Sequence, residues 1–333
     1  ISTSPRKHIQ FTYGDSLSGK VDLNQGIAGV ALSRAELILG ADAKHSGEGD
    51  GIIIHGAVNE LSLSEWYNFL HAWGENMVSA PVNNLLIDIT VGTLGLGGQH
   101  YENTQFKLLR GLPDWHATLS SDQIAGDIFI PVNANAGAVR GTFSRFRISR
   151  VAGEKNQADL DPGSLPPLRL TVDDFTYRDF GLGKLELNTA PGVSGMTIDK
   201  LSFTQPGMEI TGNGTWTLNN DSEHSDFDLV LQSESLAMMM STFNYNTEPV
   251  SEGKTRFILN AQWPGSPMDF SLADLTGSLK IKINKGKFLK IEPKSDRMFG
   301  LLNLQTLIRL VSLDFSVLFS KGYAFDKIEG SFD

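Results

Sequence analysis

Seven histidines and a Ser-x-x-Lys sequence are the first residues of this 333-residue chain to consider for chemistry. Ser251 and Lys254 match the motif of acyl-enzymes, but they lie in a polar turn, whereas the motif has to open a helix. The histidines show no metal-ligand spacing and no neighbouring nucleophile motif. They are His8, His45, His55, His71, His100, His116 and His224. We therefore expect no catalytic residues and no metal site.

Glycine-rich and acid-rich stretches are the next candidates. The stretch GTLGLGG (residues 92–98) departs from G-x-G-x-x-G, and no strand-turn-helix pattern surrounds it, so phosphate binding is not expected. Residues 46–51 and 159–163 cluster acids with glycine as calcium loops do, but without the ligand spacing of such loops. The chain has no cysteine, which excludes thiol catalysis, thiolate metal sites and disulfides. We expect no cofactor.

The charge of the chain limits its partners. The net charge is −10, and the lysines and arginines are dispersed rather than gathered in a basic stripe. Nucleic-acid binding is therefore not expected, and the overall charge does not favour an anionic membrane surface. The longest apolar runs are well short of the ~20 residues of a membrane-spanning helix.

The dominant pattern is a period of two. In residues 275–288, Leu279, Ile281 and Ile283 fall on one parity, and Lys280 and Lys282 on the other. Successive side chains of a strand point to opposite faces, so this stretch has one apolar and one polar face. Similar stretches recur at intervals near ten residues, bounded by glycine, asparagine, aspartate or proline. With 34 glycines, this predicts a mainly β protein with many turns.

Three stretches are predicted as short helices, at about residues 62–78, 235–245 and 296–311. The first begins with a capping box and carries Trp66, Phe69 and Trp73 at helical spacing. That aromatic stripe has two interpretations. It either faces the core or closes the end of a hydrophobic groove and contacts lipid.

A polar, proline-rich segment divides the chain. We predict a β-rich segment over residues 1–151, a connection over 152–167, and a second β segment over 168–333. The two β segments resemble each other loosely, which indicates growth by addition of similar strand pairs. The chain begins without Met and ends within a predicted strand, so we expect it to be a piece of a longer protein.

The number of strands limits the fold. About twenty strands with one apolar face each cannot be covered by three short helices, and a single flat sheet of them would run ~95 Å. Two sheets could pack together, or one sheet could curl. We expect a long, curved antiparallel sheet folded into an open, taco-like trough with a hydrophobic interior. The alternative is that the same residues form a closed, dry core.

The C-terminal region carries a family resemblance. Residues 298–332, with Trp263-Pro264, Gly277 and Gly286 before them, resemble the AsmA-like family, specifically its YhdP branch in Gram-negative bacteria. The resemblance implies a periplasmic protein, anchored in the inner membrane by an N-terminal helix outside this sequence. It implies bridge-like transport of phospholipids between the inner and outer membranes, and it supplies no catalytic residues. An outer-membrane or periplasmic protein partner would remain to be identified.

Under this hypothesis the apolar parity of the strands lines the lipid groove. The lining residues predicted from alternation are Ile87, Ile89, Leu170, Val172, Leu185, Leu187, Leu229, Leu231, Leu279, Ile281 and Ile283. The competing hypothesis is a structural scaffold or assembly factor of the cell envelope that carries no lipid. An envelope hydrolase would rest on Ser251 and Lys254 alone.

Overall fold

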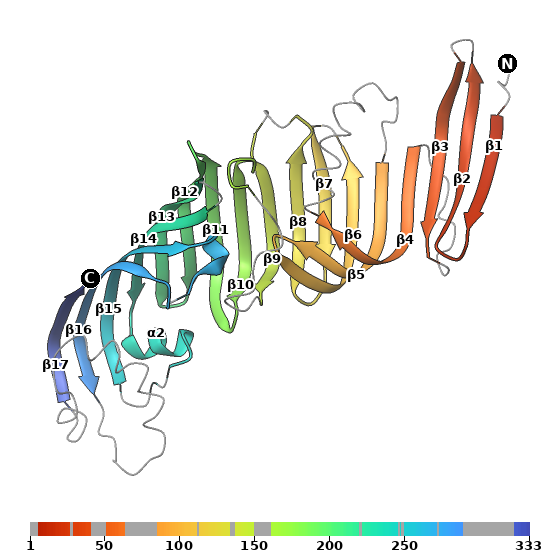
Figure 1. The fold of residues 1–333 in the computed structure, drawn as a ribbon. Helices are drawn as coiled ribbons and strands as arrows, with labels where there is room; N and C mark the ends of the chain where they lie inside the picture. The colour runs from red at the N-terminus through yellow and green to blue at the C-terminus, as the bar shows by residue number, and fades with distance from the viewer. Residues whose placement is uncertain are drawn as a thin grey trace. The chain divides into compact units, whose positions relative to one another are not determined.

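The protein is mainly β. The computed structural model describes residues 6–26, 29–40, 51–63, 85–111, 113–133, 137–149, 161–219, 222–245, 247, 250–271, 273–288 and 323–333. Within the described residues, 17 strands pair in chain order, and they can be followed by their labels and colours in Figure 1. The predicted β class and the long curved sheet are confirmed.

The strands have the following bounds: β1 Arg6–Tyr13, β2 Leu17–Gly26, β3 Gly29–Leu39, β4 Gly51–Ser62, β5 Leu85–Leu96, β6 Gln99–Arg110, β7 Asp114–Ser120, β8 Ile124–Pro131, β9 Val139–Ile148, β10 Leu168–Tyr177, β11 Phe180–Pro191, β12 Gly195–Gln205, β13 Met208–Asn219, β14 Ser222–Ser233, β15 Val250–Pro264, β16 Thr276–Phe288 and β17 Tyr323–Phe332. Two helical elements have defined bounds within the described residues, α2 (Leu236–Thr242) and the short 3-10 helix η2 (Pro267–Asp269).

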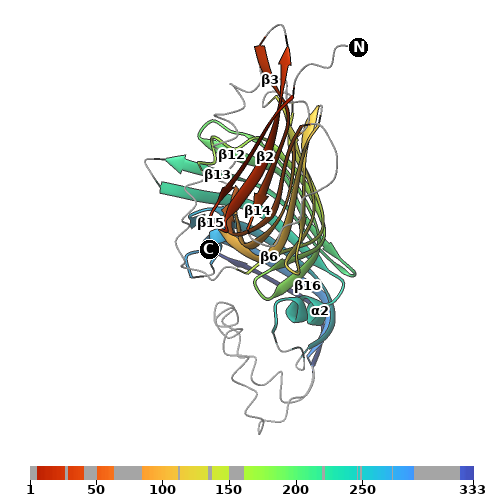
Figure 2. The same ribbon diagram turned by 90° about the vertical axis from the view of Figure 1, so that its right-hand side faces the viewer.

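By its contacts the chain separates into two compact units. Unit 1 comprises Ile1–Phe146 and Asn156–Asp159, and unit 2 comprises Arg147–Lys155 and Leu160–Asp333. The strands of unit 2 bend along their length (Figure 2). The core of unit 1 includes the inward side chains of β5, where Ile87, Ile89 and Val91 are all buried.

Two strand pairings in unit 1 differ from the expected antiparallel arrangement. β3 with β4, and β4 with β5, are parallel. Parallel neighbours need a long crossover connection, whereas a tight hairpin link makes an antiparallel pair. Long sequence intervals follow Leu39 and Ser62, in keeping with parallel pairing. Alternation in sequence reports the face of each residue but not the direction of its strand, which is why the prediction was wrong here.

The predicted helices have different outcomes. The helix expected near residues 235–245 is confirmed as α2. Of the helix expected over 62–78, Ser62 is the last residue of β4, and Trp66, Phe69 and Trp73 lie outside the described residues. The helix expected over 296–311 also lies outside them. Of the predicted 152–167 connection, residues 161–167 are described and contain no strand.

Candidate functional site

The pairing registers of unit 2 align apolar residues across eight strands. Each residue below lies directly opposite the next one on the neighbouring strand. The first row is Leu170, Leu187, Leu201, Gly212, Leu229, Leu259, Leu279 and Phe332. The second row is Val172, Leu185, Phe203, Ile210, Leu231, Phe257, Ile281 and Gly330. We call these two rows, ~7 Å apart because their residues are two positions apart on each strand, the apolar lane.

Part of the lane remains accessible to solvent, and this reverses the usual pattern of a strand in a core. On β14, Leu229 and Leu231 are half-buried, while Phe227 and Ser233 on either side are buried. β15 repeats the pattern, with Phe257 and Leu259 half-buried between buried Thr255 and Ala261. In a globular core the large apolar residues at the strand centres are the most buried. On β14 and β15 the inward residues towards the strand ends are buried, and those at the centres are only half-buried.

An aromatic cluster covers one side of the lane. Ile198, Trp216, Phe227, Ala261 and Trp263 form a buried cluster of inward residues. The Phe227 and Trp263 rings stack at 5.2 Å between centroids, and Phe270 meets Trp263 edge-on at 5.3 Å. Half-buried residues pack around this cluster, namely Leu165, Leu187, Leu201, Leu229, Leu259, Phe270 and Leu275. The cluster therefore borders the leucines of the lane.

Glycines in β13 allow close packing beside the cluster. A Cβ on Gly214 would lie 2.7 Å from Cδ1 of Phe227, and one on Gly212 would lie 2.5 Å from Cδ2 of Leu229. Both distances are shorter than real Cβ contacts, so the side chains of β14 lie over the glycine backbone. Glycine in a strand interior commonly marks such a close approach or a sharp bend.

The connection between β15 and β16 contributes Phe270 to the cluster. Residues 265–271, which we call the strap, begin with a capping box in which Asp269 Oδ2 accepts from both the backbone N–H of Ser266 (2.9 Å) and its hydroxyl (2.7 Å). The indole Nε1–H of Trp263 donates to the Ser266 carbonyl at 3.0 Å. The strap is therefore a defined element fixed to the cluster, not a loose loop.

Helix α2 covers the other side of the lane. Its buried residues are Leu236, Met239 and Met240. Leu236 lies near Gly253 and Ile283, since a Cβ on Gly253 would be 3.7 Å from Leu236 Cβ and 3.2 Å from Ile283 Cγ2. Beyond the helix, Phe243 meets Phe180 of β11 edge-on at 5.7 Å. Ile283, predicted as a lining residue, is thus buried in this covered zone.

The opposite face of the same strands is charged. Lys184 and Lys200 hold Glu186 between them, with Nζ–O distances of 2.7 and 2.5 Å. These hydrogen bonds lower the pKa of Glu186 to about 2. Lys282 and Lys327 bind Glu329 in the same way, at 3.5 and 2.8 Å. The sheet of unit 2 therefore has one ionic and one apolar face, as the alternation indicated.

The structure places nine of the eleven predicted lining residues on one face of unit 2. Eight of these lie in the apolar lane and Ile283 lies beside it under α2. The exposure varies along the lane, since Val172 and Leu185 are buried while Leu279 and Ile281 are half-buried. Ile87 and Ile89 lie in unit 1, opposite Leu108 and Phe106 of β6, and both are buried.

Sequence reasoning missed the cluster and the strap. Trp216, Phe227 and Trp263 lie on alternating stretches, so their parity was readable, but their convergence depends on the registers between β13, β14 and β15, which alternation does not give. Phe270 follows Ser-Pro-Met-Asp in a stretch without period. Its one signal was the Ser266/Asp269 spacing of a capping box.

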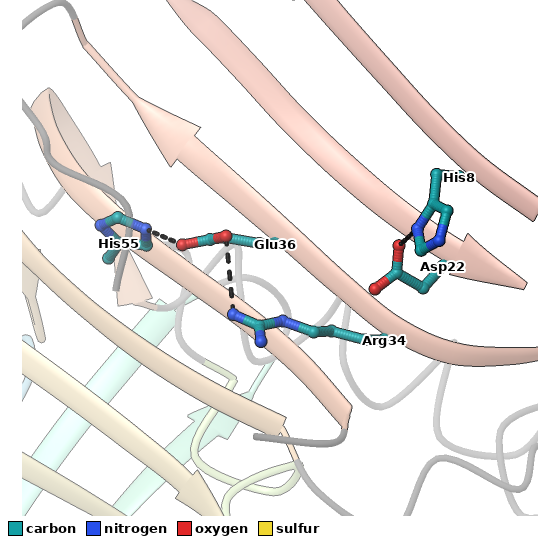
Figure 3. Close-up of polar contacts among 5 residues, drawn as sticks. All are labelled: His8, Asp22, Arg34, Glu36 and His55. Atoms are coloured by element: carbon teal, nitrogen blue, oxygen red, sulfur yellow. Dashed lines mark hydrogen bonds and ion pairs between the residues drawn. The ribbon is translucent and has the colours of Figure 1, made fainter. Parts of the chain in front are cut away.

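Several polar side chains of unit 1 contact one another directly. Glu36 is buried and binds His55 Nε2 at 3.1 Å and Arg34 at 3.6 Å, and His8 binds Asp22 at 2.6 Å (Figure 3). Within the residues that the structure describes, there is no group of three His, Cys, Asp or Glu that could hold a metal ion. In the same part of the chain, no helix has the length and apolarity needed to cross a membrane.

The family follows from a comparison with known proteins. A family model described as YhdP protein matches residues 1–333. The chain belongs to the YhdP family. This family is AsmA-like, is associated with the cell envelope, and is not known as an enzyme family. Neither a curated protein nor a solved structure gives a significant match.

Proposed function

We propose that the protein carries phospholipids between the inner and outer membranes along the apolar lane. The supporting observation is the reversed exposure of β14 and β15, where large apolar side chains at the strand centres stay accessible while both strand ends are covered. An apolar surface kept accessible in this way is expected where an apolar ligand binds. Membership of an envelope-associated family agrees with this function.

The free-energy barrier that such a carrier has to lower is large. Each methylene exposed to water costs about 0.8 kcal/mol, so a phospholipid with about 30 methylenes faces a barrier on the order of 20 kcal/mol in crossing the periplasm. A continuous apolar lane lowers that barrier by giving the acyl chains a non-aqueous contact at each step. The head group stays in water at the open side. The protein would then act in the periplasm, anchored in the inner membrane, with phospholipids and the two membranes as its partners.

A photo-crosslinking experiment tests this proposal on the two faces of one strand. The photoreactive residue p-benzoyl-phenylalanine replaces either Phe257, in the lane, or Ile258, on the other face opposite Lys280. The intact protein is irradiated in cells, purified and examined by mass spectrometry. We expect phospholipid adducts at position 257 and none at 258. Equal yields at both positions, or no adduct at 257, would refute the proposal.

One observation favours a scaffold without lipid cargo. The aromatic cluster and Phe270 close part of the same apolar face with protein side chains alone. If that closure extended along the whole lane in the cell, organic extraction of the purified protein would yield no phospholipid. Stoichiometric phospholipid in the extract would exclude the scaffold hypothesis.

A further inference from the structure

The strap joins points that would be far apart on a flat sheet. Through the successive pairings of β15, β14, β13, β12 and β11, Trp263 is aligned with Pro191 at the end of β11. Tyr177 of β10 lies opposite Phe180, the first residue of β11. Eleven residues of strand and five strand spacings would separate the two points by about 40 Å on a flat sheet. Yet the Tyr177 hydroxyl donates to the Met268 carbonyl at 2.9 Å, and the chain from Trp263 to Met268 reaches at most ~18 Å.

The sheet of unit 2 must therefore curve until opposite ends of its strands approach each other. The strap connects the two ends across the apolar face, from β15 to β10. Because the lane runs at mid-strand between those ends, the strap lies across it. This crossing is made within unit 2 and is fixed by side-chain contacts.

The two ends of the strap are held differently. At its base, the Gly265 N–H donates to the Glu223 carbonyl at 2.9 Å, and the Ser225 hydroxyl donates to the Gly265 carbonyl at 2.8 Å. Gly265 adopts φ +98°, a conformation that favours glycine and turns the chain away from β15. At its tip, the carbonyls of Met268 and Phe270 accept from the side chains of Tyr177 and Arg178, the latter at 3.1 Å.

We propose that the strap is a gate across the apolar lane, with Tyr177 and Arg178 as its latch. This inference rests on the proposed function. A lipid whose head group remains in water at the mouth of the curved sheet meets the strap on its way between β16 and β10. The base is hydrogen-bonded to β14, whereas the tip is held by the side chains of Tyr177 and Arg178 and by the packing of Phe270 on Trp263. Release of the tip about Gly265 lets the lipid pass, and the Phe270–Trp263 contact closes the strap again.

A covalent lock tests the gate, and no native cysteine within this 333-residue sequence competes for the reagent. The changes Arg178→Cys and Ser271→Cys allow a short bismaleimide to tie the tip of the strap to the β10–β11 turn. A bismaleimide is used rather than a disulfide. The long side chains of the latch reach the strap backbone from a distance, and a disulfide would need the two backbones to lie closer together. The photoreactive residue replaces Ile281 on one side of the strap or Leu170 on β10 in the intact protein. Each single-cysteine variant treated with the reagent is the control.

The yields at the two positions decide between the hypotheses. If the strap is a gate, locking abolishes phospholipid adducts at one position and leaves the other at the single-cysteine level. If both positions keep their adducts when locked, the strap is a static brace and the gate is refuted, while lipid transport stands. If the unlocked protein gives no adduct at either position, the proposed function fails, and the gate with it.

A second variant tests the latch without a cross-link. Tyr177→Phe removes the hydroxyl and keeps the ring, so the open state gains population by a factor of about five, the effect of one ordinary hydrogen bond. We expect adducts at Leu170 and Ile281 to form faster by a similar factor. The same change at the exposed Tyr13 of unit 1 is the matched control. An unchanged rate in Tyr177→Phe would remove Tyr177 from the latch.

Discussion

Ile281 lies directly opposite Phe257 across the β15–β16 pairing, and both side chains remain half-buried. One position along each strand, Ile258 and Lys280 form the next pair, on the other face. Two isoleucines in adjacent strands thus lie on opposite faces of the sheet. The pair allows the apolar lane to be tested with a single type of substitution.

Ile281→Asp places a charge in the lane, where the half-buried position can admit water beside it. We expect lipid adducts at position 257 to disappear while the free energy of unfolding falls by less than about 2 kcal/mol. Ile258→Asp is the matched control, since its carboxylate lies opposite Lys280, and we expect it to leave adducts and stability nearly unchanged. Urea unfolding measures both variants. A loss of several kcal/mol in Ile281→Asp would show a closed core at this position.

The aromatic cluster should be far more sensitive to truncation than the lane. Trp263 is 4% exposed and contacts Phe227, Phe270 and Ser266, so Trp263→Ala should lower the free energy of unfolding by about 3–5 kcal/mol. Leu231→Ala, in the half-buried lane, should cost less than about 2 kcal/mol because the residue buries less area. Equal losses in urea denaturation would contradict the distinction between cluster and lane.

Tyr101 in unit 1 offers a test of an unsatisfied polar group. The residue is 1% exposed, its hydroxyl has no hydrogen-bond partner in the structure as described, and burial raises its pKa. An unpaired buried hydroxyl is costly, so Tyr101→Phe should raise the free energy of unfolding by about 1 kcal/mol. A clear destabilisation in thermal or urea unfolding would mean that the hydroxyl has a partner in solution, such as a buried water.

Glu186 should make the stability depend on pH and salt. Its pKa is lowered from 4.5 to about 2 by hydrogen bonds from Lys184 and Lys200, so the folded state binds fewer protons than the unfolded state in that range. The stabilisation is present above pH 4.5 and fades as the pH falls towards 2. Carboxyl chemical shifts of labelled glutamate measure this pKa. A midpoint near the ordinary value would contradict the ion-pair geometry.

Comparison with Glu186→Gln then measures what the ion pairs contribute. We expect the small difference in urea midpoint at pH 6 to shrink by pH 3. It should also shrink in high salt, because these groups are exposed and screened. A difference that persists at both pH values would assign the effect to packing of the side chain.

Much of the lane was predictable from sequence, for a simple reason. Alternation with a period of two assigns each residue to a face whatever the strand's partners are, and Leu279, Ile281 and Lys280 fall on the faces that it indicates. Helix α2 was also predictable, because Leu236, Met239 and Met240 carry a local helical period. Both are local signals.

The remaining features depend on contacts between distant residues. The parallel pairing of β4 leaves no mark on its own alternation. The strap meets Tyr177 across an interval of 91 residues, and its Phe270 lies in a stretch without period. The degree to which leucines such as Leu229 remain accessible depends on what packs over them from other elements, which the sequence of one strand does not encode.

The continuous registers of unit 2 have a kinetic consequence. From β14 to β16 the first row presents Leu229, Leu259 and Leu279 in succession, one every ~4.8 Å. Under the proposed function, an acyl chain that advances by one strand along this row exchanges one leucine for another. The free-energy minima for an acyl chain along this row should therefore be nearly equal in depth, with low barriers between them. Such a surface favours diffusion over retention, because a site that binds weakly and repeatedly can be left as readily as it is entered.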